Sequence, residues 1–186
     1  MNEKLLAEIK KIADLSDEDL IFFKNSLEKE FIPKGEHFLK EGQICKHLGI
    51  VTEGLLMYYK IIDGEEIPAD FSIENEWVSY LKSLSSGSPS DMAIKALEDT
   101  HLYTLSVEKM SELFSIQPKF MSLRNYYTEI SFIKNTEHTV KFTAMNAKQR
   151  YYKLMEERAE LINRVPQYYI AAYLGIKPQS LSRLRK

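Results

Sequence analysis

The sequence predicts an α+β protein in three parts, and three observations support this division. Five of the seven glycines lie between residues 35 and 64, which concentrates tight turns in the N-terminal third. Residues 119–144 contain neither glycine nor proline, which favours one long helix. Residues 141–186 hold ten Lys and Arg against three Asp and Glu, although the whole chain has a net charge of -2. We therefore expect a β-rich domain with N-terminal helices at 1–117, a long helix at 118–145 and a basic helical unit at 146–186.

Composition narrows the class of protein further. An apolar share of 44% and a mean hydropathy of -0.32 are typical of a folded, water-soluble chain. The N-terminus has no apolar signal segment and no apolar run is long enough to span a membrane, so we expect a cytoplasmic protein. Cys45 is the only cysteine, which excludes an internal disulfide and a cysteine-built metal or iron–sulphur cage.

The β-rich part consists of short apolar or β-branched runs between the glycines. Their spacing is typical of an antiparallel sandwich or barrel. The runs that predict strands are HLGIVTE at 47–53, LLMYYKII at 55–62, EIPADFSI at 66–73, and the segments 92–97 and 102–105. Before them, Ser16 and Asp19 have the spacing of a capping box, so we expect a helix that starts there and covers the sheet.

Helical spacing follows from residue 107. A short helix at 107–114 stops before Pro118, and the long helix then carries an apolar stripe at steps of three and four residues. The stripe consists of Leu123, Tyr126, Ile130, Ile133, Glu137, Val140 and Ala144, of which only Glu137 is charged. Such a seam favours pairing with a second copy of the chain; the alternative is that it packs on its own β domain. Asn146 and Gln149 then predict a second capping box at the start of the C-terminal unit.

The last twenty residues, QYYIAAYLGIKPQSLSRLRK, predict a helix-turn-helix. Glycine at 175 suits a turn that needs a positive φ, and proline at 178 is tolerated at the start of the second helix. The small or apolar positions that fill the shared core are Ile170, Ala171, Leu174, Ile176, Leu181 and Leu184.

The polar side chains of that second helix are of the types that contact double-stranded DNA. Glutamine pairs with adenine, arginine with guanine, and hydroxyls with bases or phosphate. The candidate base readers are Gln179, Ser180, Ser182 and Arg183, and the candidate phosphate contacts at the helix ends are Lys177, Arg185 and Lys186. A solvated basic hairpin without a partner explains the glycine and the leucines, but it does not predict this choice of polar residues.

With these residues in place, the sequence resembles the Crp/Fnr transcription regulators, in particular the short Bacteroidetes-type members. The resemblance rests on the order of parts and on KALEDTHLYTL, NAKQRYYKLMEE and IAAYLGIKPQSLSRLRK. It implies a double-stranded β-helix (jelly roll) of the cyclic nucleotide-binding type and a homodimer on a pseudo-palindromic operator, with RNA polymerase as a further partner. Related proteins carry Glu-x-x-Ser-Arg in the recognition helix, whereas Gln179 replaces the acid here. The base preference is therefore expected to differ.

The resemblance also implies where an effector would bind. Relatives that bind cyclic AMP use a Gly-Glu pair for the ribose and an Arg-Ser or Arg-Thr pair for the phosphate. The corresponding stretch offers Asn75-Glu76 and Pro89-Ser90, and no arginine precedes Arg124. Lys82 could replace the arginine only as a point charge. We therefore expect a remodelled pocket that does not bind cyclic AMP in the usual way, and no cofactor.

Three other functions compete with this interpretation. Haem needs only one or two axial ligands, and the chain has four histidines, but none is supported by spacing. A cupin-type metal enzyme needs clustered imidazoles, whereas His37 and His47 are ten residues apart without a His-x-His pair. A regulatory cyclic-nucleotide-like module could instead act through a protein partner. We expect neither an enzyme nor a metal site.

Overall fold

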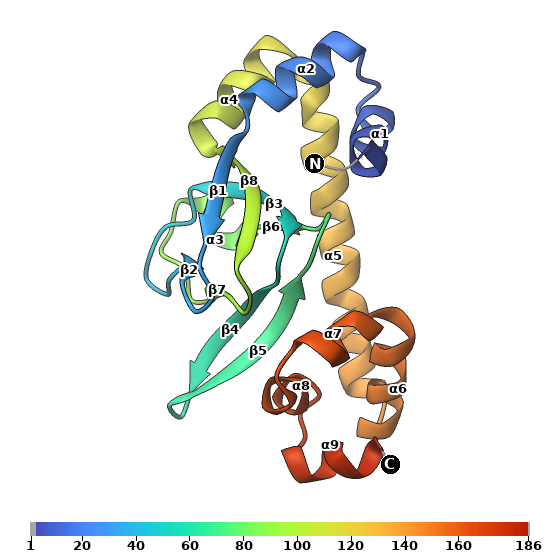
Figure 1. The fold of residues 1–186 in the computed structure, drawn as a ribbon. Coiled ribbons are helices and arrows are strands. Elements are labelled where there is room, and N and C mark those ends of the chain that lie inside the picture. Colours follow the sequence, from blue (N-terminus) through green and yellow to red (C-terminus); the bar gives the residue numbers. More distant parts are fainter. Residues whose placement is uncertain (1–2, 186) are drawn as a thin grey trace. The chain divides into compact units, whose positions relative to one another are not determined.

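The computed structural model describes residues 3–185, apart from the side chain of Lys141. The chain divides into two compact units (Figure 1). The first unit contains the residues up to Tyr58 together with Phe71–Glu129, and the second contains Tyr59–Asp70 together with the residues from Ile130 onward.

Two helices precede the strands. They are α1 (Glu3–Ile12) and α2 (Asp17–Ser26). The predicted capping box at the start of α2 is confirmed, because the Ser16 hydroxyl accepts from the Asp19 amide at 3.2 Å and the Asp19 carboxylate accepts from the Ser16 amide at 2.7 Å. Leu5 and Ile9 of α1 are buried in the same core as Phe23 of α2, so both helices cover part of the first unit.

Within the described part of the chain, eight strands form two four-stranded sheets. They are β1 (Glu28–Ile32), β2 (His37–Leu39), β3 (His47–Glu53), β4 (Leu56–Ile62), β5 (Glu65–Ser72), β6 (Trp77–Val78), β7 (Ala93–Ala96) and β8 (Thr100–Ser106). One sheet has the order β1-β8-β3-β6 and the other β2-β7-β4-β5, which is a jelly-roll-like arrangement. The short helix α3 (Leu81–Ser86) connects β6 to β7. The strands predicted at 47–53, 55–62, 66–73, 92–97 and 102–105 are confirmed as β3, β4, β5, β7 and β8.

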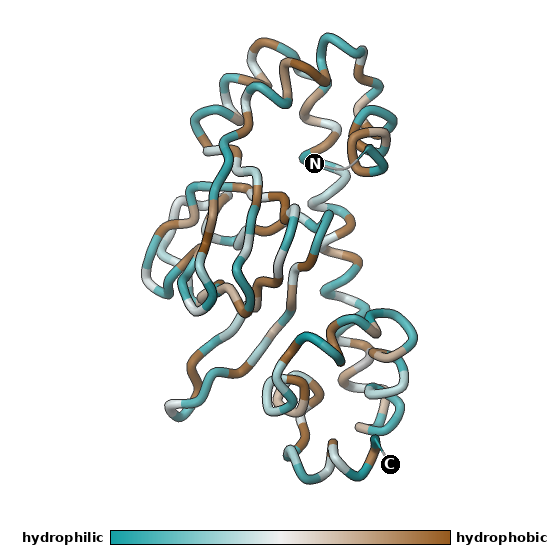
Figure 2. Tube along the Cα trace, viewed as in Figure 1, coloured by the Kyte–Doolittle hydropathy of each residue, from teal (hydrophilic) through white to brown (hydrophobic). Residues whose placement is uncertain are grey.

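Buried side chains from the strands of both sheets form one core, and Figure 2 shows hydrophobic residues along these strands. Val51, Val78 and Ile94 are buried in this core. Gly49 is tightly packed in this core, since a Cβ there would lie 2.6 Å from a methyl group of Val78 and 2.9 Å from Leu102. A larger residue would push β6 and β8 away from β3.

The described residues after β8 are mostly helical. They comprise α4 (Val107–Ile116), the 3₁₀ turn η1 (Pro118–Phe120), α5 (Met121–Ala144), α6 (Ala147–Glu157), α7 (Ala159–Arg164), α8 (Gln167–Tyr173) and α9 (Pro178–Leu184). The long helix expected at 118–145 is α5, preceded by η1. Asn146 and Gln149 form the predicted capping box of α6, with the two bonds at 2.9 and 3.0 Å.

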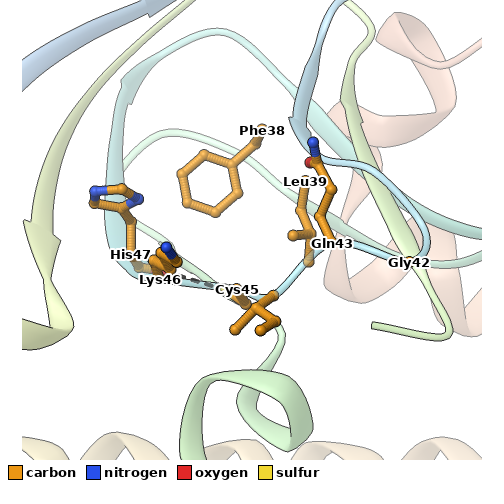
Figure 3. A pocket seen from close by; sticks show the side chains of 8 residues that line it. Phe38, Leu39, Gly42, Gln43, Cys45, Lys46 and His47 are labelled. Carbon is orange, nitrogen blue, oxygen red and sulfur yellow. Dashed lines mark hydrogen bonds between the residues drawn. The ribbon is translucent and has the colours of Figure 1, made fainter. Parts of the chain in front are cut away.

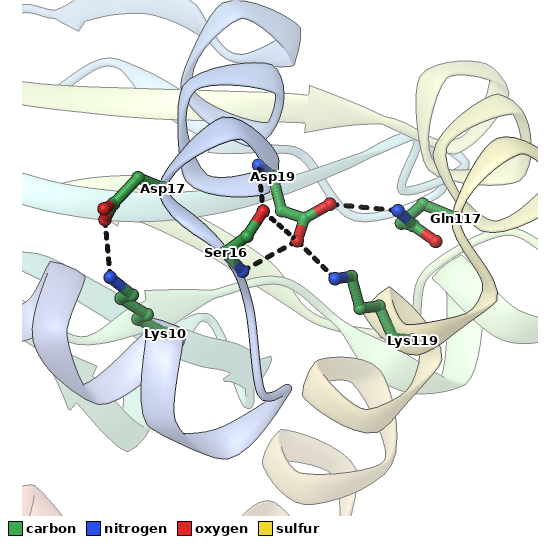
Figure 4. Close-up of polar contacts among 6 residues, drawn as sticks. All are labelled: Lys10, Ser16, Asp17, Asp19, Gln117 and Lys119. Atoms are coloured by element: carbon green, nitrogen blue, oxygen red, sulfur yellow. Dashed lines mark hydrogen bonds and ion pairs between the residues drawn. The ribbon is translucent and has the colours of Figure 1, made fainter.

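A buried carboxylate of α2 contacts the segment between α4 and α5 (Figure 4). Asp19 is 8% exposed and pairs with Lys119, and it accepts a hydrogen bond from the Gln117 amide at 2.9 Å. Hydrogen bonds from Lys119 and from Ser16 hold the pKa of Asp19 far below its ordinary value of 3.8. The network therefore fixes α2 against the segment that leads into α5.

We predict that Asp19→Asn lowers the melting temperature at neutral pH by several degrees, because the amide cannot neutralise Lys119. The folded pKa of Asp19 lies below the unfolded one, so its contribution is present above about pH 4 and is lost as the pH falls through the folded value. The difference between wild type and variant should therefore shrink in acid. Thermal unfolding followed by circular dichroism between pH 7 and pH 2 measures it.

Asp17→Asn is the matched control. Asp17 begins the same helix and pairs with Lys10 at 2.5 Å, but its side chain is 86% exposed. Exposed ion pairs contribute little to stability. Equal decreases in the melting temperature of the two variants would show that the burial of Asp19 does not contribute to stability.

Candidate nucleic-acid interface and ligand pocket

The C-terminal helices α8 and α9 are joined by a tight turn at Gly175, inside the second unit. Gly175 has a φ of 67°, where glycine is unstrained. Its amide donates to Ala172 at 2.9 Å, and the Ile176 amide donates to Ala171 at 2.9 Å. The buried side chains that hold the two helices together are Ile170, Ala171, Leu174 and Leu181, each at most 2% exposed. Ile176 and Leu184 are half-buried.

Most of the candidate DNA contacts lie on α9 and at its two ends. Pro178 is the first residue of the helix, and Leu181 faces the core. Gln179 and Arg183 are four residues apart, so they share one face of the helix. Lys177, Gln179, Ser182, Arg183 and Arg185 are exposed and Ser180 is half-buried. Lys186 lies outside the described residues.

The cations of this surface are available for a ligand. Within residues 3–185, no ion pair involves Lys177, Arg183 or Arg185. Lys153 on α6 differs, because it pairs with Glu156 at 3.1 Å and Glu157 at 3.3 Å, which raises its pKa. Carboxylates of α6 thus balance the charge of Lys153, whereas the three cations at α9 have no such partner within residues 3–185.

The predicted seam on α5 has two kinds of environment. Leu123 is 5% exposed and is part of the first unit's own core, where Tyr127 also packs. Further along the helix the apolar side chains are uncovered: Phe132 is 71%, Ile133 43% and Val140 55% exposed. Tyr126 and Ile130 are half-buried, and Glu137 and Ala144 are exposed. The second half of α5 thus leaves an apolar stripe open to solvent.

The residues proposed for an effector pocket have different surroundings in the structure. Asn75 is exposed with a φ of 69°, and the Glu76 carboxylate accepts from the Ile73 amide of its own turn at 3.1 Å. Ser90 is buried, and its hydroxyl donates to the Met92 carbonyl at 2.6 Å. The side chains of Glu76 and Ser90 are thus engaged with nearby backbone rather than directed at a ligand.

Tyr80 and Asp91, which the sequence did not single out, lie close to Lys82. Asp91 accepts a hydrogen bond from the Tyr80 hydroxyl at 2.5 Å and pairs with Lys82 at 3.3 Å. Burial and the Asp91 carboxylate raise the pKa of Tyr80 to about 12. The cation proposed for an anionic effector thus already faces a carboxylate. Asp91 directly follows Ser90, but nothing in the local pattern indicates that Tyr80 folds back onto it.

The structure contains a hollow of about 540 Å³ elsewhere in the first unit, on the segment that joins β2 to β3 (Figure 3). Its lining consists of Phe38, Leu39, Gly42, Gln43, Ile44, Cys45, Lys46 and His47. The backbone of Ser90 borders this segment, since its amide donates to Gln43 at 2.8 Å and its carbonyl accepts from Gly42 at 2.7 Å. Pro89, beside it, is exposed. None of the proposed pocket side chains lines the hollow.

The tip of the β4–β5 hairpin belongs to the second unit. It carries two carboxylates that contact residues of the C-terminal helices. Glu66 accepts a hydrogen bond from the Tyr169 hydroxyl on α8, and Asp70 pairs with Arg158 at 3.1 Å. Burial and the Glu66 carboxylate raise the pKa of Tyr169. Within the second unit, the hairpin thus contacts α8 through Glu66 and the end of α6 through Asp70.

Metal sites and membrane spans have no candidate within residues 3–185. No three His, Cys, Asp or Glu side chains in this range gather in a way that could hold a metal ion. None of the helices described there combines the length and the apolar character that a membrane span requires. The described residues therefore offer no candidate metal site for the cupin interpretation.

Comparison with known proteins places this geometry in a family. Residues 29–117 match the family described as the cyclic nucleotide-binding domain. FixK2 from Bradyrhizobium japonicum is 18% identical with a TM-score of 0.72, over 86% of this chain and 82% of that chain. CLP from Xanthomonas campestris, a c-di-GMP responsive global regulator, is 14% identical with a TM-score of 0.70, over 91% and 89% of the two chains.

A protein from Eubacterium rectale assigned to the crp/fnr family of transcriptional regulators is 18% identical, with a TM-score of 0.70 over 92% of this chain and 82% of that chain. A comparison with curated proteins finds no match. Residues 29–117 therefore match the cyclic nucleotide-binding domain family, and the chain as a whole has the fold of the Crp/Fnr regulators, which confirms the resemblance seen in its sequence.

Proposed function

We propose that this protein is a DNA-binding transcription regulator of the Crp/Fnr type. The proposal rests on the two sides of the short helix α9. One side is apolar and buried, and the other exposes amide, hydroxyl and guanidinium groups. The arginine of the exposed side pairs with no carboxylate of residues 3–185. Helices of this kind place their side chains against base edges in the major groove. The helix-turn-helix then consists of α8, the turn at Gly175 and α9.

The proposed working form is a homodimer joined along α5. The exposed Ile133 and Val140 of the seam give a reason for pairing, because a second copy would remove them from water. Two readers related by a two-fold axis should face major grooves about 34–36 Å apart on a pseudo-palindromic site. In this scheme residues 1–117 sense a signal, 118–145 join the subunits and 146–186 read DNA, with RNA polymerase as the further partner.

Selection of bound sequences from a random pool of double-stranded DNA tests the proposal directly. We expect enrichment of an inverted repeat with a centre-to-centre spacing of about one helical turn. Gel shifts on the selected site should weaken steeply with added salt, because phosphate contacts release counterions. Recovery of no sequence above background, with the folded dimer present, would reject DNA binding and favour a module that acts through a protein partner.

We predict that cyclic AMP at millimolar concentration neither raises the melting temperature nor changes DNA affinity. The chain has no arginine before Arg124 to hold the cyclic phosphate, and the Asp91 carboxylate already faces Lys82. The Asp91 carboxylate would repel a phosphate placed beside Lys82. Isothermal calorimetry measures the binding, and the fluorescence of Trp77, the only tryptophan, offers a second signal.

Trp77 is suited to that signal because its ring centroid lies 4.5 Å from that of Tyr127 on α5. A ligand that shifts the short strand β6 against α5 would change the environment of the indole. Micromolar binding of cyclic AMP would contradict the prediction, and Glu76, Lys82 and Ser90 would then be the first residues to replace.

A further inference from the structure

Arg150, on the first turns of α6, joins two segments that are far apart in sequence. Its Nε and Nη2 atoms both donate to the carbonyl of Leu174, at 3.2 and 2.8 Å. Its Nη1 atom donates to the carbonyl of Met145 at 2.6 Å. All three residues lie in the second unit. One guanidinium thus connects the C-terminal end of α5 with the C-terminal end of α8.

The position of Leu174 makes this contact important. Leu174 is the C-cap of α8, and the chain reverses at the next residue, Gly175. A carbonyl at the end of a helix lacks an intrahelical donor, so it needs a partner from elsewhere. The paired N–H groups of Arg150 supply that partner in a fixed direction, which a planar fork does and a flexible ammonium does not.

Phe142 completes the cluster from α5. The Arg150 guanidinium carbon lies 4.6 Å from the centroid of the Phe142 ring, within the range of a cation–π contact. A Cβ on Gly175 would lie 3.3 Å from the Phe142 ring and 3.7 Å from Arg150 Nη2. The aromatic ring and the guanidinium together therefore cover the turn between α8 and α9.

We infer that Arg150 is a positioning residue that fixes the α8–α9 turn to the end of α5 and so sets the direction in which α9 is presented. Arg150 itself contacts no base in this scheme; it acts through Leu174. The consequence for DNA rests on the proposed function, whereas the consequence for the turn does not. If α5 joins two copies, the same contact sets the distance between the two α9 helices.

Arg150→Lys tests the inference because lysine keeps the charge but loses the fork. On the selected operator we expect affinity to fall roughly 10- to 100-fold, in line with the loss of hydrogen bonds from a charged donor. We also expect the variant to lose preference for the correct spacing, so that operators with one or two added central base pairs bind nearly as well as the original. The wild type should discriminate strongly between them.

Arg158→Lys is the matched control. Arg158 lies at the other end of α6, where its guanidinium bonds to the Asp70 carboxylate at 3.1 Å, a contact that an ammonium can also make. It should therefore keep both the affinity and the spacing preference. If Arg150 only stabilised the fold, Arg150→Lys would lower the affinity for all operators by the same factor, and the order of preference among the spacings would stay unchanged. That result, or wild-type binding by Arg150→Lys, would overturn the inference.

Amide hydrogen exchange on the DNA-free protein gives a measurement that does not depend on DNA binding. Arg150→Lys should increase exchange over residues 174–181, while residues 159–164 of α7 stay as protected as in the wild type. Unchanged exchange at 174–181 would overturn the inference even if the protein binds DNA. If the wild type bound no DNA, the proposed function would fail, and this exchange result would still decide whether Arg150 holds the turn.

Discussion

Lysine at both Ile133 and Val140 is expected to convert the protein into a monomer and to remove its tight binding to DNA. Both side chains are uncovered on α5, 43% and 55% exposed, so the substitutions should leave the fold of the single chain intact. In a parallel helix pair, however, each lysine would place a charge in the apolar seam. Sedimentation at micromolar concentration should show the change from dimer to monomer.

The effect on DNA follows from the absence of a second reader. Binding of the second half-site within one dimer gains roughly 10²- to 10⁴-fold in affinity from effective concentration, and a monomer does not have this gain. Gel shifts on the selected operator and on a single half-site should therefore converge for the variant. The melting temperature of the double variant indicates whether the single chain is still folded.

Lysine at Thr128 and Asn135 provides the control for charge. These two residues are exposed on the same helix and lie outside the predicted seam. The same charge change there should leave the dimer and the DNA affinity close to wild type. A dimer that survives lysine at Ile133 and Val140 would mean that the stripe on α5 is not the place where two copies meet.

Local sequence signals predicted the elements that depend on local contacts. The Ser16–Asp19 and Asn146–Gln149 pairs are capping boxes in the structure because both partners are three residues apart, within one turn of helix. The short apolar and β-branched run at 47–53 coincides with β3, because such residues favour the extended conformation. Gly175 was identified as the turn because few other residues adopt a φ of 67° without strain.

Signals that depend on distant parts of the chain were not predictable. The strand β1 (Glu28–Ile32) is an edge strand with a mostly exposed, charged sequence, and it exists because it pairs with β8, some seventy residues later in the chain. The hydroxyl of Tyr80 meets Asp91 only because α3 folds the chain back. The contact of Arg150 with Leu174 likewise requires three helices to be in place.

The seam on α5 shows how one pattern can serve two partners. Spacing alone treats all its members alike, but Leu123 is buried in its own chain and Val140 is open to solvent. The difference arises because the first turns of α5 pack with α1 and α4 in the core of the first unit. Periodicity identifies an apolar face, whereas the tertiary structure decides which part of it is left for a second copy.

Removal of Arg183 is expected to affect specific DNA recognition, whereas removal of a cation at the ends of α9 should affect all DNA alike. Arg183 and Gln179 share one exposed face, from which both can reach neighbouring base pairs. Replacing either by alanine should cost roughly 1–3 kcal/mol on the selected operator and little on random DNA. Fluorescence anisotropy with both DNAs, at matched salt, gives the ratio of the two affinities.

Lys177 and Arg185 flank the helix and are assigned to phosphates. Alanine at either position should weaken binding to the operator and to random DNA by the same factor. It should also reduce the slope of log affinity against log salt by about one unit for each phosphate that is no longer neutralised, so by about two in a dimer. The opposite result would be an unchanged ratio of operator to random affinity in Arg183→Ala and a loss of the preference for the operator in Arg185→Ala. The assignment of base reader and phosphate contact would then be reversed, because recognition would depend on the end of α9 rather than on its exposed face.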